Sequence, residues 1–180
     1  NLTFPLFGFF AVLSLIGMGS APRAYGQVTD PSPYCNVSAS ECNSFFEPSI
    51  TEVQVGSFSN TSACNNERTV TYFNNLQPID APRGQQISGS ITVESYNFND
   101  HGVGIWIDFN GDGAFSPSEQ VHQSELPGGT SIHNFSFTVP NDAKANCITR
   151  MRVKTDENTL TPPDEACEMS SFFGDGEVED

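Results

Sequence analysis

The fold is decided by the stretch VGIWIDFNGDGAFSPSE, which spans residues 103–119. In its first part, from Val103 to Ile107, side chains alternate with a period of two, which is typical of a β-strand. Its second part, from Asp108 to Glu119, is dense in Asp, Asn, Gly and Ser, the residues that favour turns. We therefore predict a strand that runs directly into a polar loop rich in oxygen ligands.

The same period of two recurs along the chain. Alternating runs lie at 53–55, 70–72, 87–93, 103–109, 133–139 and 147–153. Turn-forming residues separate these runs, and no stretch has a convincing helical stripe. At least six short strands predict an all-β fold, an antiparallel, jelly-roll-like β-sandwich that buries one face of each sheet.

Composition agrees with a single all-β domain and excludes some partners. The 180 residues include 15 Gly, 12 Pro and 15 Phe, while only 16% are charged, which disfavours long surface helices. Seven Lys and Arg stand against 22 Asp and Glu, a net charge of -15. Because such a chain repels phosphates, we predict no nucleic-acid partner.

An apolar run, Phe4–Met18, lies near the start of the chain. It is shorter than the roughly 18 residues that a membrane-spanning helix needs, so we predict no membrane span. Ala24-Tyr25-Gly26 fits a cleavage site after the run, with Ser20-Ala21-Pro22 as the alternative. We expect residues 1–26 to be a signal peptide lacking its first residues, because no initiator Met and no basic segment precede the run.

The expected export signal sets the domain boundaries and the compartment. Residues 27–33 are polar and contain proline, which predicts a linker, and the domain then spans 34–180. We expect the mature protein to be secreted, extracellular or at the cell surface. In such an oxidising environment most of the five cysteines should form disulfides.

Five cysteines leave one without an intramolecular partner. Sequence alone does not select among the possible pairings. Our preferred arrangement pairs Cys35 with Cys42 and Cys147 with Cys167. In that arrangement Cys64 is free or paired outside the chain.

The segment Asp108–Glu119 satisfies every position of the calcium-loop pattern D-x-[DN]-x-[DN]-G-x5-E. This spacing turns alternate oxygens towards one centre, and Gly113 stands where the chain must reverse sharply. We predict a Ca²⁺ site with carboxylate, amide, hydroxyl and main-chain ligands. These ligands come from Asp108, Asn110, Asp112, Ala114 (main-chain carbonyl), Ser116 and Glu119.

The flanks of this loop differ from those of an EF-hand. A strand precedes the loop, and Ser116 with Pro117 predicts only one short helical turn ending near Glu119. Because the helix pair that opens in calcium sensors is absent from this pattern, we predict a structural ion and no sensor function. The alternative is an acidic hairpin turn without metal.

Four motifs resemble the GEVED domain, a module of secreted bacterial proteins. They are Gly104–Phe115, then Phe137-Thr-Val-Pro-Asn-Asp-Ala143, then Thr149-Arg-Met-Arg-Val153, and finally Gly176-Glu-Val-Glu-Asp180. With Tyr34-Cys35 and Cys167, the resemblance covers about residues 34–180. It implies a β-rich, non-catalytic module of larger exported or surface proteins, often beside peptidase, adhesive or sorting modules. The family motif normally continues into a Tyr and a final strand, beyond the last residue of this chain.

Two charged pairs near the end of the chain suggest a latch. Arg150 and Arg152 share one parity, and Glu177 and Glu179 flank Val178. If the two strands are neighbours, the arginines would face the glutamates as cross-strand pairs. The alternatives are that each set is solvated, or that Asp175, Glu177 or Asp180 completes the calcium shell.

No catalytic motif stands out, so we predict that the protein is not an enzyme. His133 shares the parity of Phe135 and Phe137, which favours a structural histidine. Trp106 is either a sugar-stacking platform or, as we favour, a core residue covered by the second sheet. The first functional hypothesis is a calcium-binding module for adhesion to a carbohydrate or surface ligand. The second is a structural spacer that contacts neighbouring modules of the parent chain, for example beside a peptidase domain.

Overall fold

The computed structural model describes residues 33–37, 47–64, 70–73, 76–95, 100–157, 160–162, 164–169 and 176–180. The expected signal peptide and nearly all of the expected linker lie outside these ranges. Cys42 and Asp175, which entered the disulfide and calcium predictions, also lie outside them.

Within the described ranges the protein is all-β, as predicted, and its helical content is one short 3-10 turn. The elements in chain order are β1 (Ser49–Val55), β2 (Phe58–Thr61), β3 (Gln86–Ser95), β4 (His101–Ile107), η1 (Pro117–Glu119), β5 (Gln120–Leu126), β6 (Gly129–Thr138), β7 (Met151–Glu157) and β8 (Gly176–Glu179).

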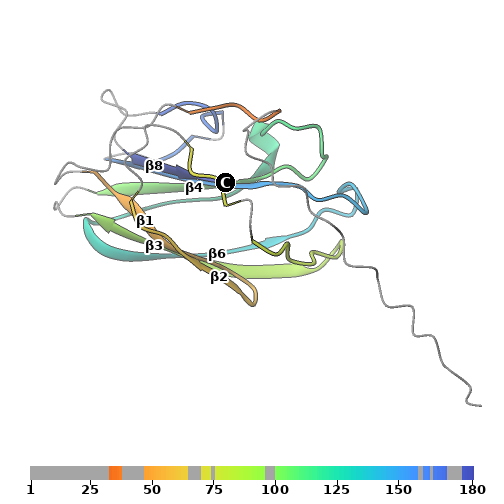
Figure 1. Ribbon diagram of the computed structural model, residues 1–180, viewed down its shortest axis with the longest axis horizontal. Helices are drawn as coiled ribbons and strands as arrows, with labels where there is room; N and C mark the ends of the chain where they lie inside the picture. Colours follow the sequence, from red (N-terminus) through yellow and green to blue (C-terminus); the bar gives the residue numbers. More distant parts are fainter. Residues whose placement is uncertain are drawn as a thin grey trace, which may run out of the picture.

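The strands form two antiparallel sheets stacked as layers (Figure 1). Sheet A has the order β2-β1-β3-β6, and sheet B has the order β5-β4-β7-β8. Strands β5 and β6 are consecutive in the chain but belong to different sheets, so their connection closes one side of the sandwich. Beside β8, Thr71 adds an isolated parallel bridge to Glu179.

The main core fills the space between the sheets. It is built mainly from the apolar residues of one parity on β1, β3, β4, β6 and β7, because a period of two sends alternate side chains to opposite faces. Its buried members are Ile50, Val53, Val55, Ile87, Ile91, Val93, Val103, Ile105, Ile107, Phe135, Phe137, Val139, Ala143 and Val153.

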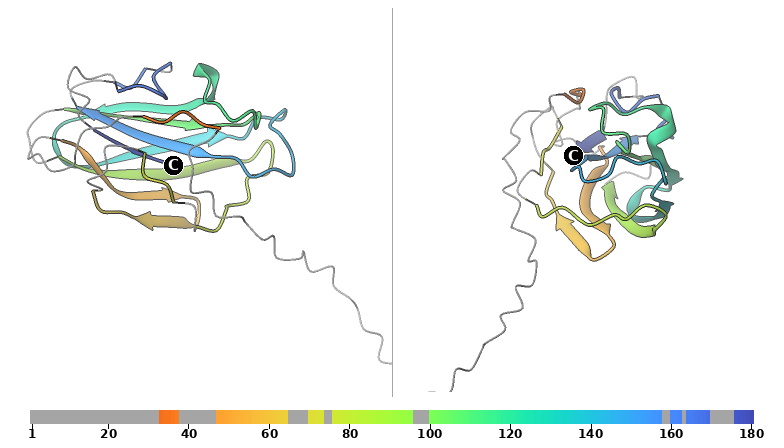
Figure 2. Two further views of the ribbon diagram at one scale, coloured as in Figure 1. Left: turned by 45° about the horizontal axis from the view of Figure 1, so that its top comes forward. Right: turned by 90° about the vertical axis from the view of Figure 1, so that its right-hand side faces the viewer.

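The outer face of sheet B is also covered, and this second layer positions the candidate site. Every residue of β4 is buried, on both faces of the strand. The segment 33–37, which we call the strap, crosses this face together with the loop after β4 and the 160s (Figure 2). Charged residues of β7 are therefore buried beneath a loop layer instead of facing water.

Trp106 belongs to this outer layer. It is fully buried and clusters with Phe115 and Ala166, so it is not an exposed platform for sugars. Our expectation that the second sheet covers it was wrong, because its parity directs it away from sheet A. Gly104 makes room for the indole, since a Cβ there would lie 2.5 Å from the Trp106 ring.

Some strand limits differ from the sequence prediction. Strand β7 begins at Met151 and continues to Glu157, whereas the alternating run ended at Val153. The extension contains Lys154 and Asp156, which are buried as an ion pair of 3.0 Å. Strands β2 and β5 were not predicted, because their sequences are mostly polar.

The disulfide pairing that the sequence favoured is wrong. Cys35 is bonded to Cys167, 132 residues away, and neither Cys35–Cys42 nor Cys147–Cys167 forms. Cys147 is an exposed free thiol, and Cys64 is disulfide-bonded instead of free. The Cys35–Cys167 bond ties the strap to the 160s, the two segments that cover sheet B.

Candidate functional site

The calcium-loop segment begins where β4 ends, and Asp108 organises its first turn. Asp108 is fully buried. Its Oδ1 accepts hydrogen bonds from the backbone N–H groups of Gly111 (2.6 Å) and Asp112 (3.3 Å), and its Oδ2 accepts one from Gly113 (3.0 Å). Gly111 and Gly113 have φ of 64° and 85°, the left-handed region in which glycine is unstrained. The chain thus folds back around one carboxylate.

Asn110 and Asp112 continue the same type of turn at the surface. Asn110 Oδ1 accepts the backbone N–H of Asp112 at 2.8 Å, and Asp112 Oδ1 accepts that of Ala114 at 2.9 Å. The two side chains also contact each other, since Asn110 Nδ2 donates to Asp112 Oδ2 at 2.9 Å. Both residues are exposed at the rim of the loop. The three predicted ligands of the first half therefore follow each other in successive Asx turns.

Glu119 closes the loop from its other end. The predicted helical turn is confirmed as η1, with Ser116 as N-cap and Pro117 in its first turn. Glu119 Oε2 accepts hydrogen bonds from the backbone N–H and the hydroxyl of Ser116, both at 2.8 Å, while Oε1 accepts a long one from Asn110 N at 3.4 Å. The side chain is only 5% exposed. Positions 3, 9 and 12 of the pattern are thus linked by hydrogen bonds.

The donor set suits a hard divalent cation, since its side chains offer carboxylate, amide and hydroxyl oxygens. In the structure these oxygens instead accept hydrogen bonds from the loop backbone. Within the part of the chain that the structure describes, no three His, Cys, Asp or Glu side chains are arranged to hold a metal ion. The chemistry of the residues therefore fits Ca²⁺, whereas a coordination geometry is not shown.

Tyr34 is a part of the site that the sequence pattern did not reveal. Its hydroxyl donates to Asp108 Oδ2 at 2.6 Å, across 74 residues. Burial and this carboxylate raise the pKa of Tyr34 to about 12, so the hydroxyl stays a donor at neutral pH. The ring contacts Phe115 at 5.0 Å, and the Arg150 guanidinium stacks on it at 4.4 Å. Through Tyr34 the loop holds the strap.

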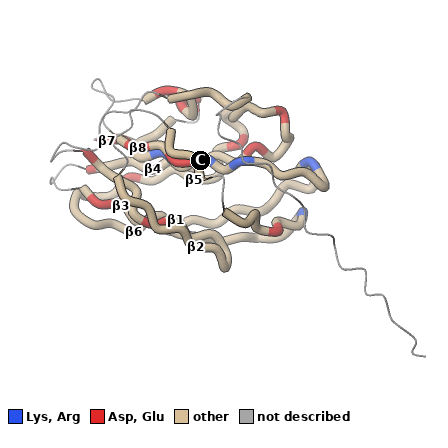
Figure 3. Tube along the Cα trace, in the orientation of Figure 1, with Lys and Arg blue, Asp and Glu red and all other residues tan. Residues whose placement is uncertain are grey.

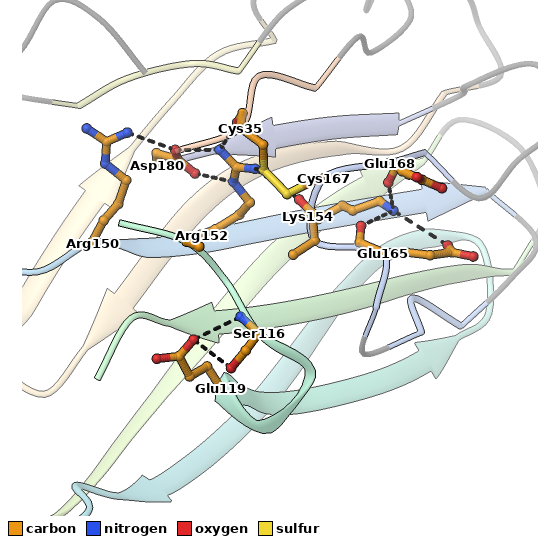
Figure 4. Close-up of a disulfide and its surroundings, with 12 residues drawn as sticks. Cys35, Ser116, Glu119, Arg150, Arg152, Lys154, Glu165, Cys167, Glu168 and Asp180 are labelled. Carbon is orange, nitrogen blue, oxygen red and sulfur yellow. Dashed lines mark hydrogen bonds and ion pairs between the residues drawn. A yellow bond between two sulfur atoms is a disulfide. The ribbon is translucent and has the colours of Figure 1, made fainter. Parts of the chain in front are cut away.

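Arg152 sits beside the strap and is fully buried (Figure 4). It forms a two-point pair with Asp180, with Nε to Oδ1 at 2.6 Å and Nη2 to Oδ2 at 2.8 Å. Its other donors reach Cys35 O at 2.9 Å, Ala166 O at 2.9 Å and Cys35 Sγ at 3.1 Å. All five guanidinium N–H groups are satisfied. We call Arg152, Asp180 and the Cys35–Cys167 disulfide the clasp, because they join the strap, β7, the 160s and the end of β8.

A second buried cation on β7 extends this cover. Lys154 Nζ pairs with Asp156 at 3.0 Å and donates to the carbonyl oxygens of Glu165, at 3.2 Å, and Glu168. Figure 4 shows Lys154 pointing into the 160s from the same face of β7 as Arg152. Both cations thus bind the loop layer to sheet B.

The predicted latch forms with a different partner. In the β7–β8 register Val153 lies opposite Glu179, which places Arg152 beside Asp180 and not beside a glutamate. Arg150 also contacts Asp180, at 3.4 Å. Glu177 points to the other face, where its Oε2 accepts the backbone N–H of Ile50 at 2.8 Å. The interpretation that Arg150 and Arg152 pair with Glu177 and Glu179 was therefore wrong.

The charge of the described residues remains strongly acidic. Figure 3 shows acidic positions on both sheets and in the loops, and few basic ones. No helix within the described ranges is long and apolar enough to cross a membrane.

The family model described as the GEVED domain matches residues 102–180. The match runs from β4 through the loop and β7 to Asp180, and it therefore includes both the candidate calcium loop and the acidic partner of the clasp. It confirms the resemblance over residues 102–180, and a GEVED domain is present in the chain, whereas the part of the resemblance expected from residue 34 onwards lies outside the match. No curated protein matches the chain.

Proposed function

We propose that this GEVED-containing chain is a non-catalytic, extracellular module of a larger secreted or cell-surface protein, and that its loop binds Ca²⁺ as a structural ion. The proposed ligands are the side chains of Asp108, Asn110, Asp112, Ser116 and Glu119 and the main-chain carbonyl of Ala114.

The observation that carries the calcium proposal is the burial of two loop carboxylates. Asp108 is 0% and Glu119 is 5% exposed, yet no ion pair of the described residues involves either. Burying a carboxylate is costly unless a positive charge compensates it. Lys144, a cation that contacts the loop, donates to the carbonyl of Gly111 at 3.0 Å and not to either carboxylate. A divalent cation held by oxygen ligands would supply the missing charge.

The position of the loop supports a structural role for the ion. A strand leads into it and η1 leads out, so the helix pair that opens in calcium sensors has no counterpart around this loop. Asp108 holds the strap through Tyr34, and the strap covers sheet B. An ion that orders this loop would therefore stabilise the loop layer that covers the outer face of sheet B.

Thermal unfolding of the full chain in EDTA and in 10 mM CaCl₂ tests the proposal. An extracellular site with a Kd of about 10⁻⁴ M would gain about 2.7 kcal/mol at this concentration, which corresponds to about 5–10 °C in Tm. Glu119→Gln removes the twelfth-position carboxylate and should abolish the shift. Glu125→Gln is the matched control, because it makes the same change at an exposed position of β5 and should keep the shift. An unchanged Tm of the wild type, or an equal shift in Glu119→Gln, would reject the calcium site.

The buried Trp106 favours the spacer hypothesis over carbohydrate binding, because it removes the aromatic platform that stacking on sugars requires. The Cys35–Cys167 disulfide supports an oxidising location. We therefore propose that the module mainly contacts its neighbours in the parent chain, for example a peptidase domain, with adhesion to a carbohydrate or surface ligand as the second candidate. Glycan-array and cell-wall pull-down experiments distinguish them, since retention of the isolated chain would favour adhesion.

A further inference from the structure

All three histidines of the chain gather at one place inside the sandwich. His101 lies on β4, His122 on β5 and His133 on β6, so the cluster joins sheet B to sheet A. The rings of His101 and His133 are fully buried with centroids 5.2 Å apart. His122 reaches the same group through Ser124, and its ring also lies 5.9 Å from that of Phe135.

Hydrogen bonding connects two of the rings through a single hydroxyl. Ser124 Oγ lies 2.6 Å from His133 Nδ1 and 2.8 Å from His122 Nε2. Within the described part of the chain, His133 Nε2 and both ring nitrogens of His101 are buried without a hydrogen-bond partner. A proton taken up on any of these three nitrogens would find no acceptor in place.

The charged groups around the cluster differ between its two buried members. His101 has two carboxylates nearby: Asp100 precedes it, and Glu157 lies opposite it on β7. His133 lies opposite Ile91 on β3, and on β5 it contacts Ser124 and is repelled electrostatically by His122. The remaining acids of the adjoining strands, Glu94 on β3 and Glu125 on β5, have the outward parity. Of the described groups that face His133, none carries a negative charge.

Burial therefore favours the neutral form of each ring. It lowers the pKa of His101 and of His122, and with repulsion from these two rings it lowers the pKa of His133 to about 4. For a base with a lowered folded-state pKa, the contribution to stability is complete above about 6.5 and is lost as the pH falls towards 4.

We propose that the histidine cluster is an acid-sensitive contact that lets the β5–β6 side of the sandwich open when it takes up a proton. A charged His133 in an apolar core, beside two imidazoles, is destabilising. Separation of the two sheets at this place would let water solvate the charge and so lower its free energy. Strands β5 and β6 are the edge strands of their sheets, each bonded to a single neighbour. Losing their packed faces would release their hydrogen bonds first, while β1, β3, β4 and β7 stay protected.

Amide hydrogen exchange between pH 7 and pH 4.5, corrected for intrinsic rates, tests this proposal. With an imidazole pKa of about 6.5 in the open state and about 4 in the closed state, the open population rises by up to tenfold per pH unit, so protection in β5 and β6 should fall by about 20-fold from pH 6 to pH 4.5. His133→Phe keeps a ring in the core but cannot be protonated, and it should lose this dependence. Ser124→Ala is the matched control, because it removes the hydroxyl and keeps the imidazole, and it should retain the dependence.

Three results would overturn the proposal. The first is equal pH dependence of protection in β5, β6 and the central strands, and the second is an unchanged acid response in His133→Phe. The third is a histidine titration followed by NMR on the wild-type chain, which does not depend on the folding of any variant. The imidazole signals of His133 should stay those of the neutral ring down to about pH 5. A titration midpoint above pH 6 would show that protonation costs nothing and would reject the mechanism.

Discussion

Replacing Arg152 by methionine should be the most damaging single change in the outer layer. Methionine fills much of the same volume but leaves the Asp180 carboxylate buried with only the weaker contact to Arg150 at 3.4 Å. It also removes the donors to the carbonyl groups of Cys35 and Ala166. Removing one partner of a buried ion pair costs about 3–5 kcal/mol. For a domain of this size that corresponds to a Tm lower by about 6–20 °C.

The matched control is Arg150→Met, the same substitution two residues away on the same face of the sheet. Arg150 is 16% exposed, makes one 3.4 Å contact with Asp180 and stacks on Tyr34 at 4.4 Å, so its loss should cost about 1–2 kcal/mol, less than the loss of Arg152. Urea unfolding followed by circular dichroism measures both free energies on one scale. If the two variants lost equal stability, or if Arg152→Met lost less than about 1 kcal/mol, the clasp would not be a stabilising element.

Three further outcomes follow from the same contacts. Cys35→Ser should lower the free energy of unfolding by about 2–5 kcal/mol in urea melts, because the lost crosslink spans 132 residues; an unchanged midpoint would contradict this. Burial raises the pKa of Glu179 to about 8, so its stabilising neutral form is lost as the pH rises from 4.5 through 8. Glu179→Gln should therefore match the wild type near pH 4.5 and exceed it in stability at pH 9, and equal stability of the two at pH 9 would argue against the raised pKa. An Arg150→Ala and Glu177→Ala cycle should show coupling below about 0.5 kcal/mol, because Glu177 faces Ile50 instead.

The inter-sheet core was predictable because it obeys a local rule. Strands β3, β4 and β6 place apolar residues at every second position, and the sequence shows that period directly. Strand β5 and the second half of β7 break the rule for a physical reason. Lys154 and Asp156 occupy the outer face of β7, which a sandwich normally exposes, and are buried beneath the loop layer, where Lys154 donates to the backbone of Glu165 and Glu168. A local pattern contains no information about such a cover.

The candidate loop likewise has a part that could be predicted from local sequence and a part that could not. Its turns depend on spacing within twelve residues, so Asp108, Gly113 and η1 could be placed from the sequence. The contact of Tyr34 with Asp108 depends on the path of the chain over 74 residues and left no signal in the pattern. The cysteine pairing failed for the same reason, because the partners are brought together by the fold and not by spacing.

The register between β7 and β8 decides which acidic residues pair with Arg150 and Arg152. Parity correctly indicated that Arg150 and Arg152 share one face, but parity within a strand does not say which face of the neighbouring strand is aligned with it. The observed register puts Asp180 on the arginine side and both glutamates on the inner side. A shift of one residue would have exchanged these roles.

The loop and the clasp meet at consecutive residues of the strap. Tyr34 is held by Asp108, and Cys35 is held by Arg152 and by the bond to Cys167. Because one peptide unit separates Tyr34 from Cys35, a displacement of either residue also displaces the other. We therefore expect ordering of the loop and closure of the clasp to be coupled. Such coupling would keep the buried ion pairs on the outer face of sheet B away from water as one unit.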